Sequence, residues 1–326
     1  MALRGGIDLG GTKIQAVVLD DHHELHGQAR RPTPLAGGPA DIADAMAHAL
    51  REAATLARTQ TAELHGIGVG SPGQVDTAAG TVTSAKNLPG WAGTFPLAAT
   101  LEEALGAPVR VTNDVGAATD AEALLGAGRD LASFLAVFWG TGVGGAFVQD
   151  GHRWRGRGFA GELGHMVVKV DGARCPCGRR GCMEAYAGRK AMEERARRLV
   201  EDGRRTELFK LMNERGRDRL TSGIWERALA RGDRMAAELV DRALAAIGAA
   251  VASAVNLLDP DGVVLGGGLG VRFGAPMADR LADAMHPHLF ADKRPPVVRV
   301  AALGDLGGAI GASLLVAEPA ATGAGA

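Results

Sequence analysis

Alternating apolar residues in this chain are interrupted by short glycine clusters. An apolar run reaches Leu9, two glycines follow, and Ile14, Ala16 and Val18 then alternate with other residues. Alternation with a period of two is typical of strands, so this segment predicts a strand, a tight turn and a return strand. The segment LAVFWGTGVGGAFVQDG, residues 135–151, has the same pattern. The chain is therefore predicted to be internally duplicated.

A different period indicates a helix closer to the end of the chain. Apolar residues recur there at steps of three and four, at Leu244, Ile247, Val251, Val255 and Leu258. This spacing predicts a helix with one buried stripe, followed by a turn at DPDG and a buried strand that ends in glycines. Residues 303–317 are expected to form a last helix that returns to the first domain. Between residues 193 and 220 arginines alternate with acidic residues, which favours a solvated helix face.

Composition narrows the functional classes. The chain has 326 residues, 46% of them apolar, which is enough for a substantial core and for two domains. The net charge of −1 gives no global positive field, so nucleic acid and anionic membranes are not expected partners. The apolar run 243–258 is shorter than the roughly 20 residues that span a bilayer, and no apolar signal core opens the chain. We expect a cytoplasmic protein that acts on small molecules.

All three cysteines lie in one short segment. Cys175, Cys177 and Cys182 are interleaved with proline and glycine, and His165 lies just upstream. Three thiolates and an imidazole can fill a tetrahedral zinc shell, and a closed shell leaves no position for an activated water. We therefore expect a structural zinc, with three unrelated thiols as the alternative. An odd cysteine count in a reducing compartment makes a disulfide framework the weaker interpretation.

The first glycine cluster has the chemistry of a phosphate site. Gly10 and Gly11 let backbone N–H groups approach a phosphate, Thr12 and Lys13 add donors, and Asp8 could hold magnesium through water. The order of residues does not match a P-loop, because Thr12 stands where that motif has lysine. An ordinary glycine hairpin is the alternative.

Two stretches match the spacing G-x-G-x-x-G, at residues 68–73 and 140–145. Neither is followed by the helix that a dinucleotide site requires, so both are poor dinucleotide fingerprints. The second fits a hairpin phosphate turn better, with Gly140, Thr141 and Gly142 as its binding residues. Two such turns could clamp one nucleotide from both sides.

Asn113 and Asp114 lie where a short strand is expected to give way to an alanine-rich helix. One of the pair can cap the helix, since Asn and Asp both accept hydrogen bonds from the first backbone N–H groups. The other can face a substrate, and a carboxylate near a sugar hydroxyl can accept its proton during attack on phosphorus. Capping alone is the alternative for both.

Taken in order, these motifs resemble one family. DLGGTK, SPGQVD, NLPGW, VTNDVGAA, GTGVGG, GELGH, CPCGRRGCMEAYAG and VVLGGGLG are similar to the ROK family of sugar kinases and repressors, within the actin–hexokinase ATPase superfamily. The resemblance implies an α/β, actin-like ATPase (ribonuclease H-like) fold of two domains with a cleft between them. We expect the smaller domain at residues 1–118 and 305–326 and the larger at 119–304.

The resemblance also implies residue roles. Asp114 matches the catalytic base, and Gly267 and Gly268 match the adenosine site, with magnesium bound together with ATP. Sugar contacts are implied at Gly73, Asn87, Asn113, Asp114, Glu162, His165 and Glu184. If so, His165 binds zinc through one ring nitrogen and a sugar hydroxyl through the other, and the zinc preorganises the sugar pocket.

The implied activity is phosphorylation of glucose at its 6-hydroxyl by ATP. The alternatives are an N-acetylhexosamine kinase for GlcNAc or ManNAc, a fructokinase, and a non-catalytic sugar sensor. The repressors of the family carry a helix-turn-helix segment ahead of the phosphate turn, and Asp8 lies too near the start of this chain for one, so an enzyme is expected. The resemblance further implies a homodimer or homotetramer, and it leaves the choice between ATP and polyphosphate open.

Overall fold

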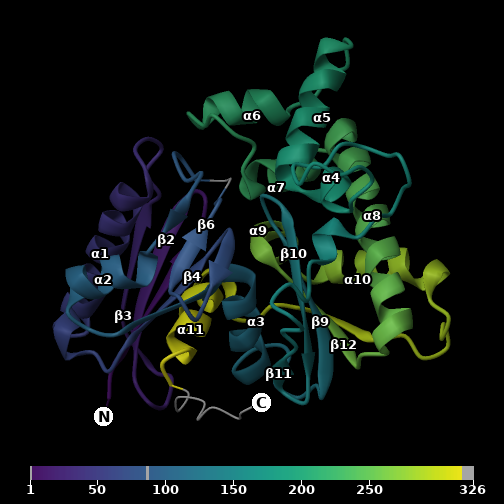
Figure 1. Ribbon diagram of the computed structural model, residues 1–326. Helices are drawn as coiled ribbons and strands as arrows, with labels where there is room; N and C mark the ends of the chain where they lie inside the picture. Colours follow the sequence, from purple (N-terminus) through teal and green to yellow (C-terminus); the bar gives the residue numbers. More distant parts are fainter. Residues whose placement is uncertain (1, 86–87, 318–326) are drawn as a thin grey trace. The chain divides into compact units, whose positions relative to one another are not determined.

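The computed structural model describes residues 2–85 and 88–317 (Figure 1). It divides into two compact units, Met1–Leu125 with Asp305–Ala326 and Gly126–Gly304. The division expected after residue 118 falls inside helix α3 (Asp114–Leu124). The units part after Leu125 instead, because a helix is one hydrogen-bonded piece that folds within a single unit.

The first unit is built on a five-stranded sheet in the order β3-β2-β1-β4-β8. Strand β1 pairs antiparallel with β2 and parallel with β4, and β4 pairs parallel with β8. The predicted strand–turn–strand is thereby confirmed. The strands are β1 (Arg4–Leu9), β2 (Lys13–Leu19), β3 (Leu25–Pro32), β4 (Ile67–Ser71) and β8 (Val109–Asn113), beside a small sheet of β5 (Gln74–Asp76), β6 (Thr81–Thr83) and β7 (Thr94–Phe95).

Helices cover both faces of this sheet. Alternate residues of β2, Ile14, Ala16 and Val18, join the core formed with α1 (Pro39–Leu56) and α2 (Leu97–Leu105). The residues between them point to the other face, where Val17 and Leu19 pack with Ala309 of α11 (Gly307–Leu314). The predicted last helix therefore does return to the first unit, where it packs against α3 and the sheet.

The second unit repeats the first. Its sheet has the order β11-β10-β9-β12-β13, with two antiparallel pairings followed by two parallel ones, as in the first unit. This repetition confirms the predicted internal duplication. The strands are β9 (Ser133–Trp139), β10 (Val143–Gln149), β11 (His152–Arg153), β12 (Gly262–Gly266) and β13 (Val297–Val300).

The predicted helix of the second unit is α8 (Arg234–Leu258), and it starts earlier than the apolar stripe. Asp233 begins it, since its side chain accepts a hydrogen bond from the Ala236 N–H at 2.7 Å. The other helices are α4 (Glu184–Ala187), α5 (Arg189–Glu201), α6 (Leu208–Glu214), α7 (Ser222–Ala230), α9 (Gly267–Phe273) and α10 (Ala275–Met285), with short 3₁₀ turns η1 (Thr61–Glu63), η2 (Leu163–His165), η3 (His286–His288) and η4 (Gly304–Leu306).

The arginine-rich stretch forms α5 and α6, and most of its charged residues are exposed, as predicted. Within the described residues, no helix has both the length and the apolarity needed to cross a bilayer.

Candidate active site

In the first unit, the register of three parallel strands gathers the predicted residues at one edge of the sheet. Asp8 pairs with Gly70, and Ser71 pairs with Asn113. The carboxyl ends of β1, β4 and β8 therefore meet, which is where ligands bind in open α/β sheets. Gly70 has no side chain to occupy this edge of the sheet. A Cβ at this position would lie 3.4 Å from the Asp114 Cα, in van der Waals contact with it.

Asn113, and not Asp114, caps helix α3. The Asn113 side chain accepts a hydrogen bond from the Gly116 N–H at 3.1 Å. Asp114 is the first residue of the helix, half-buried, and its Oδ1 accepts from the Val115 N–H at 2.9 Å. Capping thus accounts for the asparagine, whereas Asp114 follows it inside the first turn and remains the candidate for the predicted base.

Asp8 is a perturbed carboxyl beside Asp114. Burial, and then the charge of Asp114, raise the pKa of Asp8 to about 7, although Lys13 acts in the opposite direction. The first turn of α11 closes over it, since a Cβ on Gly308 would lie 2.6 Å from Asp8 Cγ. Lys13 Nζ is itself held by Asp305 Oδ1 at 2.8 Å. Two neighbouring carboxylates favour a divalent cation, so the site fits the magnesium that the sequence predicts.

The turn that joins β1 to β2, residues 10–13, is the first glycine turn. The Gly10 N–H donates to the Lys13 carbonyl at 2.9 Å, and the Thr33 hydroxyl donates to the Gly10 carbonyl at 2.6 Å. Thr12 is exposed at its tip. The backbone of the turn is therefore fixed while its tip stays accessible.

Two further predicted sugar contacts belong to the first unit. Gly73 follows β4 with φ +98°, a left-handed conformation that favours glycine. A Cβ there would lie 3.0 Å from the Thr83 carbonyl oxygen. Asn87 lies outside the described residues.

In the second unit, residues 140–142 form the second glycine turn, between β9 and β10. The Gly140 N–H donates to the Gly142 carbonyl at 2.9 Å. Glu184 supports the turn, because its Oε2 accepts from the Val143 N–H at 3.0 Å. A Cβ on Gly142 would lie 2.2 Å from that oxygen. A side chain at position 142 would therefore require the Glu184 carboxylate to move.

Gly267 and Gly268 follow β12, which lies next to β9. Gly267 has φ +77°, and a Cβ on it would lie 2.6 Å from the Trp139 carbonyl oxygen. A Cβ on Gly140 would lie 3.9 Å from the Gly268 nitrogen. The predicted adenosine glycines and the second glycine turn are therefore neighbours.

His165, Cys175, Cys177 and Cys182 form what we call the Cys/His cluster, with one ligand atom from each within 4.8 Å of the others. The Cys177 and Cys182 sulfurs are 3.7 Å apart, and Cys175 Sγ lies 3.7 Å from His165 Nδ1. The three cysteines are free thiols. Burial raises the pKa of the Cys175 thiol. Three sulfurs and an imidazole nitrogen at this spacing are the donor set of a structural zinc site.

The predicted sugar-binding acids lie directly beside this cluster. Glu162 Oε2 lies 3.9 Å from His165 Nε2, so the imidazole has Cys175 at one nitrogen and a carboxylate at the other. The Cys175 thiol also donates to Glu184 Oε1 at 3.8 Å. Glu162, His165 and Glu184 are therefore brought together, as the two-role hypothesis for His165 requires.

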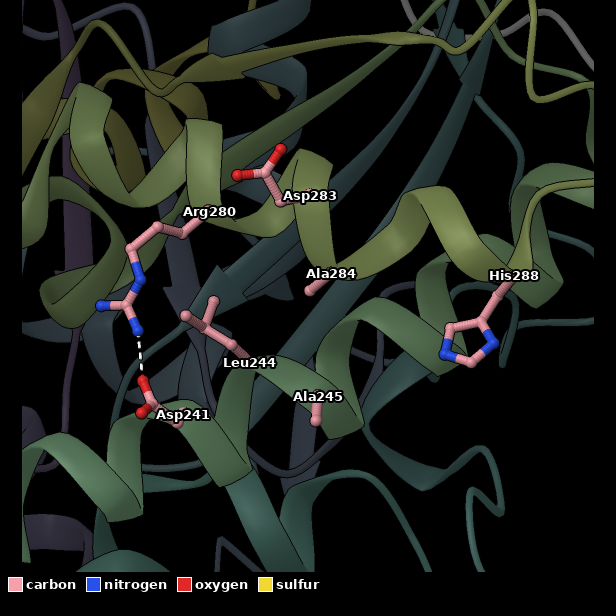
Figure 2. Close-up of a pocket in the computed structure, with 7 residues that line it drawn as sticks. All are labelled: Asp241, Leu244, Ala245, Arg280, Asp283, Ala284 and His288. Carbon is pink, nitrogen blue, oxygen red and sulfur yellow. Dashed lines mark hydrogen bonds and ion pairs between the residues drawn. The ribbon is translucent and has the colours of Figure 1, made fainter.

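A cavity on the second unit lies away from these residues. It has a volume of about 320 Å³ and lies between α8 and α10 (Figure 2). Leu244, Ala245 and Ala284 form its apolar part, and Arg280 and Asp241 point toward each other across it in an ion pair. None of the predicted site residues lines it.

Comparison with known proteins identifies the family. The model described as ROK family matches residues 4–319. The chain belongs to the ROK family. A glucokinase of Halalkalibacterium halodurans is 33% identical over 320 residues, which cover 96% of this chain and 94% of that protein. An N-acetyl-D-glucosamine kinase of Shigella boydii serotype 4 is 32% identical over 322 residues, covering 95% of this chain and 98% of that protein.

A solved ROK structure agrees with the sequence relatives. The ROK family glucokinase of Streptomyces griseus, in complex with glucose and AMPPNP, superposes with a TM-score of 0.81 at 30% identity, covering 96% of this chain and 99% of that one. This chain has the actin-like ATPase fold of the ROK sugar kinases, which confirms the predicted fold class.

One polar residue beside the second glycine turn of this ROK protein was missed by the sequence reasoning. Arg189 opens α5, and its guanidinium donates to Thr141 Oγ1 at 2.9 Å and to Ser222 Oγ at 3.2 Å. Its only signal in the sequence is its place directly after the cysteine segment, within a stretch where arginines are common.

Proposed function

We propose that the protein is a hexose kinase that transfers the γ-phosphoryl group of ATP to the 6-hydroxyl of glucose. The observation that carries the proposal is the pair of neighbouring carboxylates, Asp8 and Asp114, at the carboxyl ends of β1, β4 and β8. Membership of the ROK family and the similarity to two glucokinases support the same activity.

Asp114 is assigned the role of general base. Its carboxylate accepts the proton of the sugar hydroxyl as that oxygen forms a bond to the γ-phosphorus and the bond to the β-phosphate oxygen breaks. Asn113 positions it, because the asparagine fixes the start of α3. Asp8 would hold magnesium, which supplies charge neutralisation to the phosphates of ATP when bound. Each of the two glycine turns has backbone N–H groups of the kind that bind phosphate.

The Cys/His cluster is assigned a structural zinc. His165, Cys175, Cys177 and Cys182 would hold the ion, which supplies rigidity and no hydrolytic water. Glu162, His165 and Glu184 would then be held in place for hydrogen bonds with sugar hydroxyls. Gly73, Asn87 and Asn113 are the other proposed sugar contacts. Preorganisation of this kind reduces the cost of orienting the substrate.

An N-acetylhexosamine kinase is the second candidate, since one relative at 32% identity bears that name. A coupled assay of ADP release over glucose, GlcNAc, ManNAc and fructose, with ATP or polyphosphate as donor, tests both. We expect the highest kcat/KM with glucose and ATP. A higher value with an acetamido sugar would establish the second candidate, and no sugar-dependent release would refute a kinase.

Substitution of Asp114 by Asn tests the base directly. We expect kcat to fall about 10²–10⁴-fold, because the amide cannot take the proton, while glucose affinity by calorimetry stays near the original. Glu103→Gln, at an exposed position of α2, is the control and should keep full activity. A near-normal kcat in Asp114→Asn would remove Asp114 from the role of base.

The proposal also places the enzyme in the cytoplasm as a homodimer or homotetramer. Light scattering on the purified chain measures its mass directly, and a monomer at micromolar concentration would contradict the assembly.

A further inference from the structure

Arg189 is fixed to the second glycine turn by both its backbone and its side chain. Its N–H donates to the Gly140 carbonyl at 3.1 Å, and the next residue, Lys190, donates to the Thr141 carbonyl at 3.1 Å. The guanidinium then reaches back to Thr141 Oγ1 at 2.9 Å. A change in the turn therefore moves Arg189 with it.

Within the described part of the chain, Arg189 forms no direct ion pair with a carboxylate, and Glu193 acts on it only through its charge. The hydrogen bonds of the guanidinium go to two hydroxyls, those of Thr141 and Ser222. Glu193 is the acid on the same helix that faces it, but Glu193 Oε1 is bonded to Arg197 and its Oε2 to the Leu220 N–H.

Burial opposes the charge of this guanidinium. Arg189 is half-buried, and burial lowers the pKa of its guanidinium; the charge of Glu193 acts in the opposite direction, and the neighbouring cation Arg219 lowers the pKa further. A partly desolvated cation without a directly bonded counter-ion is costly, and a bound anion reduces that cost. A guanidinium has five N–H donors, so the two hydroxyl contacts leave donors for such an anion.

The surroundings of Arg189 indicate which anion. Thr141 belongs to the second glycine turn, and Ser222 faces the other glycine loop, since a Cβ on Gly268 would lie 3.2 Å from Ser222 Oγ. The guanidinium thus lies between a turn that exposes backbone N–H groups and the glycines after β12. Arg forks bind phosphate oxygens through paired N–H groups, which suits this position.

We propose that Arg189 binds the phosphate chain of the nucleotide, with Thr141 and Ser222 holding the guanidinium fork in place. The inference rests on the proposed function for its ligand, and it adds a cationic side chain of the second unit to the proposed phosphate contacts. The group that Arg189 would bind is a chain of phosphates, and either a nucleotide or an inorganic polyphosphate could supply it.

Calorimetry on the full chain tests the inference without turnover. The probes are ADP, inorganic tripolyphosphate and adenosine, and the variants are Arg189→Ala and Arg189→Lys. Arg198→Ala, an exposed position of the same helix, is the matched control. We expect Arg189→Ala to weaken ADP and tripolyphosphate about tenfold to hundredfold and to leave adenosine and glucose affinity unchanged. Arg189→Lys should be intermediate, because it keeps the charge and loses the fork.

The outcomes separate this inference from the proposed function. Unchanged ADP and tripolyphosphate affinity in a folded Arg189→Ala variant overturns the inference. A loss of adenosine affinity as large as the loss of ADP affinity also overturns it, because Arg189 would then contact the nucleoside. Loss for ADP but not for tripolyphosphate would also contradict a phosphate-chain contact. If Arg189→Ala weakens ADP as expected but the original chain phosphorylates no sugar, the inference stands and the proposed function fails.

Discussion

Replacing Asp8 by Asn should stabilise the protein while removing a group that is proposed to hold magnesium. The pKa of Asp8 is raised from its ordinary value of 3.8 to about 7, first by burial and then by the charge of Asp114. At neutral pH and above, the folded protein therefore holds a carboxylate in a place that disfavours its charge. Asn has nearly the same shape and carries no charge, so it removes this cost.

The magnitude follows from the difference between the two pKa values. Each pKa unit corresponds to about 1.36 kcal/mol, so a rise of roughly three units is worth about 4 kcal/mol. A raised pKa means that the folded state binds the proton more tightly than the unfolded chain does. The stabilisation of Asp8 is thus fully present below about pH 4 and is lost as the pH rises through about 7. Roughly 2.5 kcal/mol of the loss develops between pH 5 and pH 8.

Urea unfolding followed by circular dichroism at several pH values from 5 to 8 measures this difference. We expect the free energy of unfolding of Asp8→Asn minus that of the original chain to increase with pH and to reach about 4 kcal/mol at pH 8. Asp44→Asn is the control, since Asp44 lies on α1 of the same unit with its side chain 70% exposed. Its effect should stay within about 0.5 kcal/mol at every pH.

Two results would refute this reasoning. An Asp8→Asn variant that is less stable than the original chain at pH 8 would mean that the Asp8 carboxylate is stabilised in the folded protein. A difference that does not change with pH would mean that Asp8 titrates in the folded protein as it does in the unfolded chain. Loss of ATP-dependent turnover in the same variant is expected separately, because Asp8 is proposed to hold magnesium.

Two further substitutions test the second unit. Cys177→Ser should lower the zinc content per chain, measured by atomic emission, and weaken glucose binding about tenfold, whereas Arg174→Ala in the same segment should change neither; zinc loss with unchanged glucose affinity would contradict the structural role. Gly142→Ala should destabilise the protein by about 1–3 kcal/mol and lower kcat/KM, because its Cβ would lie 2.2 Å from Glu184 Oε2. Gly223→Ala, with open space around it, should be neutral, and equal effects of the two would argue against the close contact at Gly142.

Elements whose signal lies within one short segment were predictable from the sequence. The two hairpins were found because alternation and a glycine turn are both local, and α8 was found because its stripe repeats every three to four residues. The start of α8 was missed, since the first residues of the helix lie ahead of the recognised stripe and only Asp233 marks its beginning. The units of the structure divide after Leu125, at the end of α3, and the sequence signal at the start of this helix, its cap Asn113, does not specify how far the helix continues.

Features that depend on register between distant segments could not be predicted from pattern alone. The proximity of Asp8 to Asp114 requires β1, β4 and β8 to lie side by side and parallel, and no local signal specifies that order. The contact of Arg189 with Thr141 likewise joins residues that are far apart in the sequence. Family resemblance supplied Asp114 as a candidate, and the structure adds the neighbouring carboxylate that perturbs Asp8.

Glu184 links the second glycine turn to the Cys/His cluster. One of its oxygens accepts from the Val143 N–H beside the second glycine turn, and the other accepts from the Cys175 thiol of the Cys/His cluster. Glu184 also lies two residues after Cys182, so a displacement of the cysteine segment reaches the turn through this one side chain. Zinc would bind Cys175 as a thiolate, which has no S–H to donate, so the ion would act on the turn through the backbone that joins Cys182 to Glu184. This arrangement gives the clustered cysteines a physical purpose, because an ion that fixes Cys182 would also fix the start of α4, from which Glu184 supports the turn.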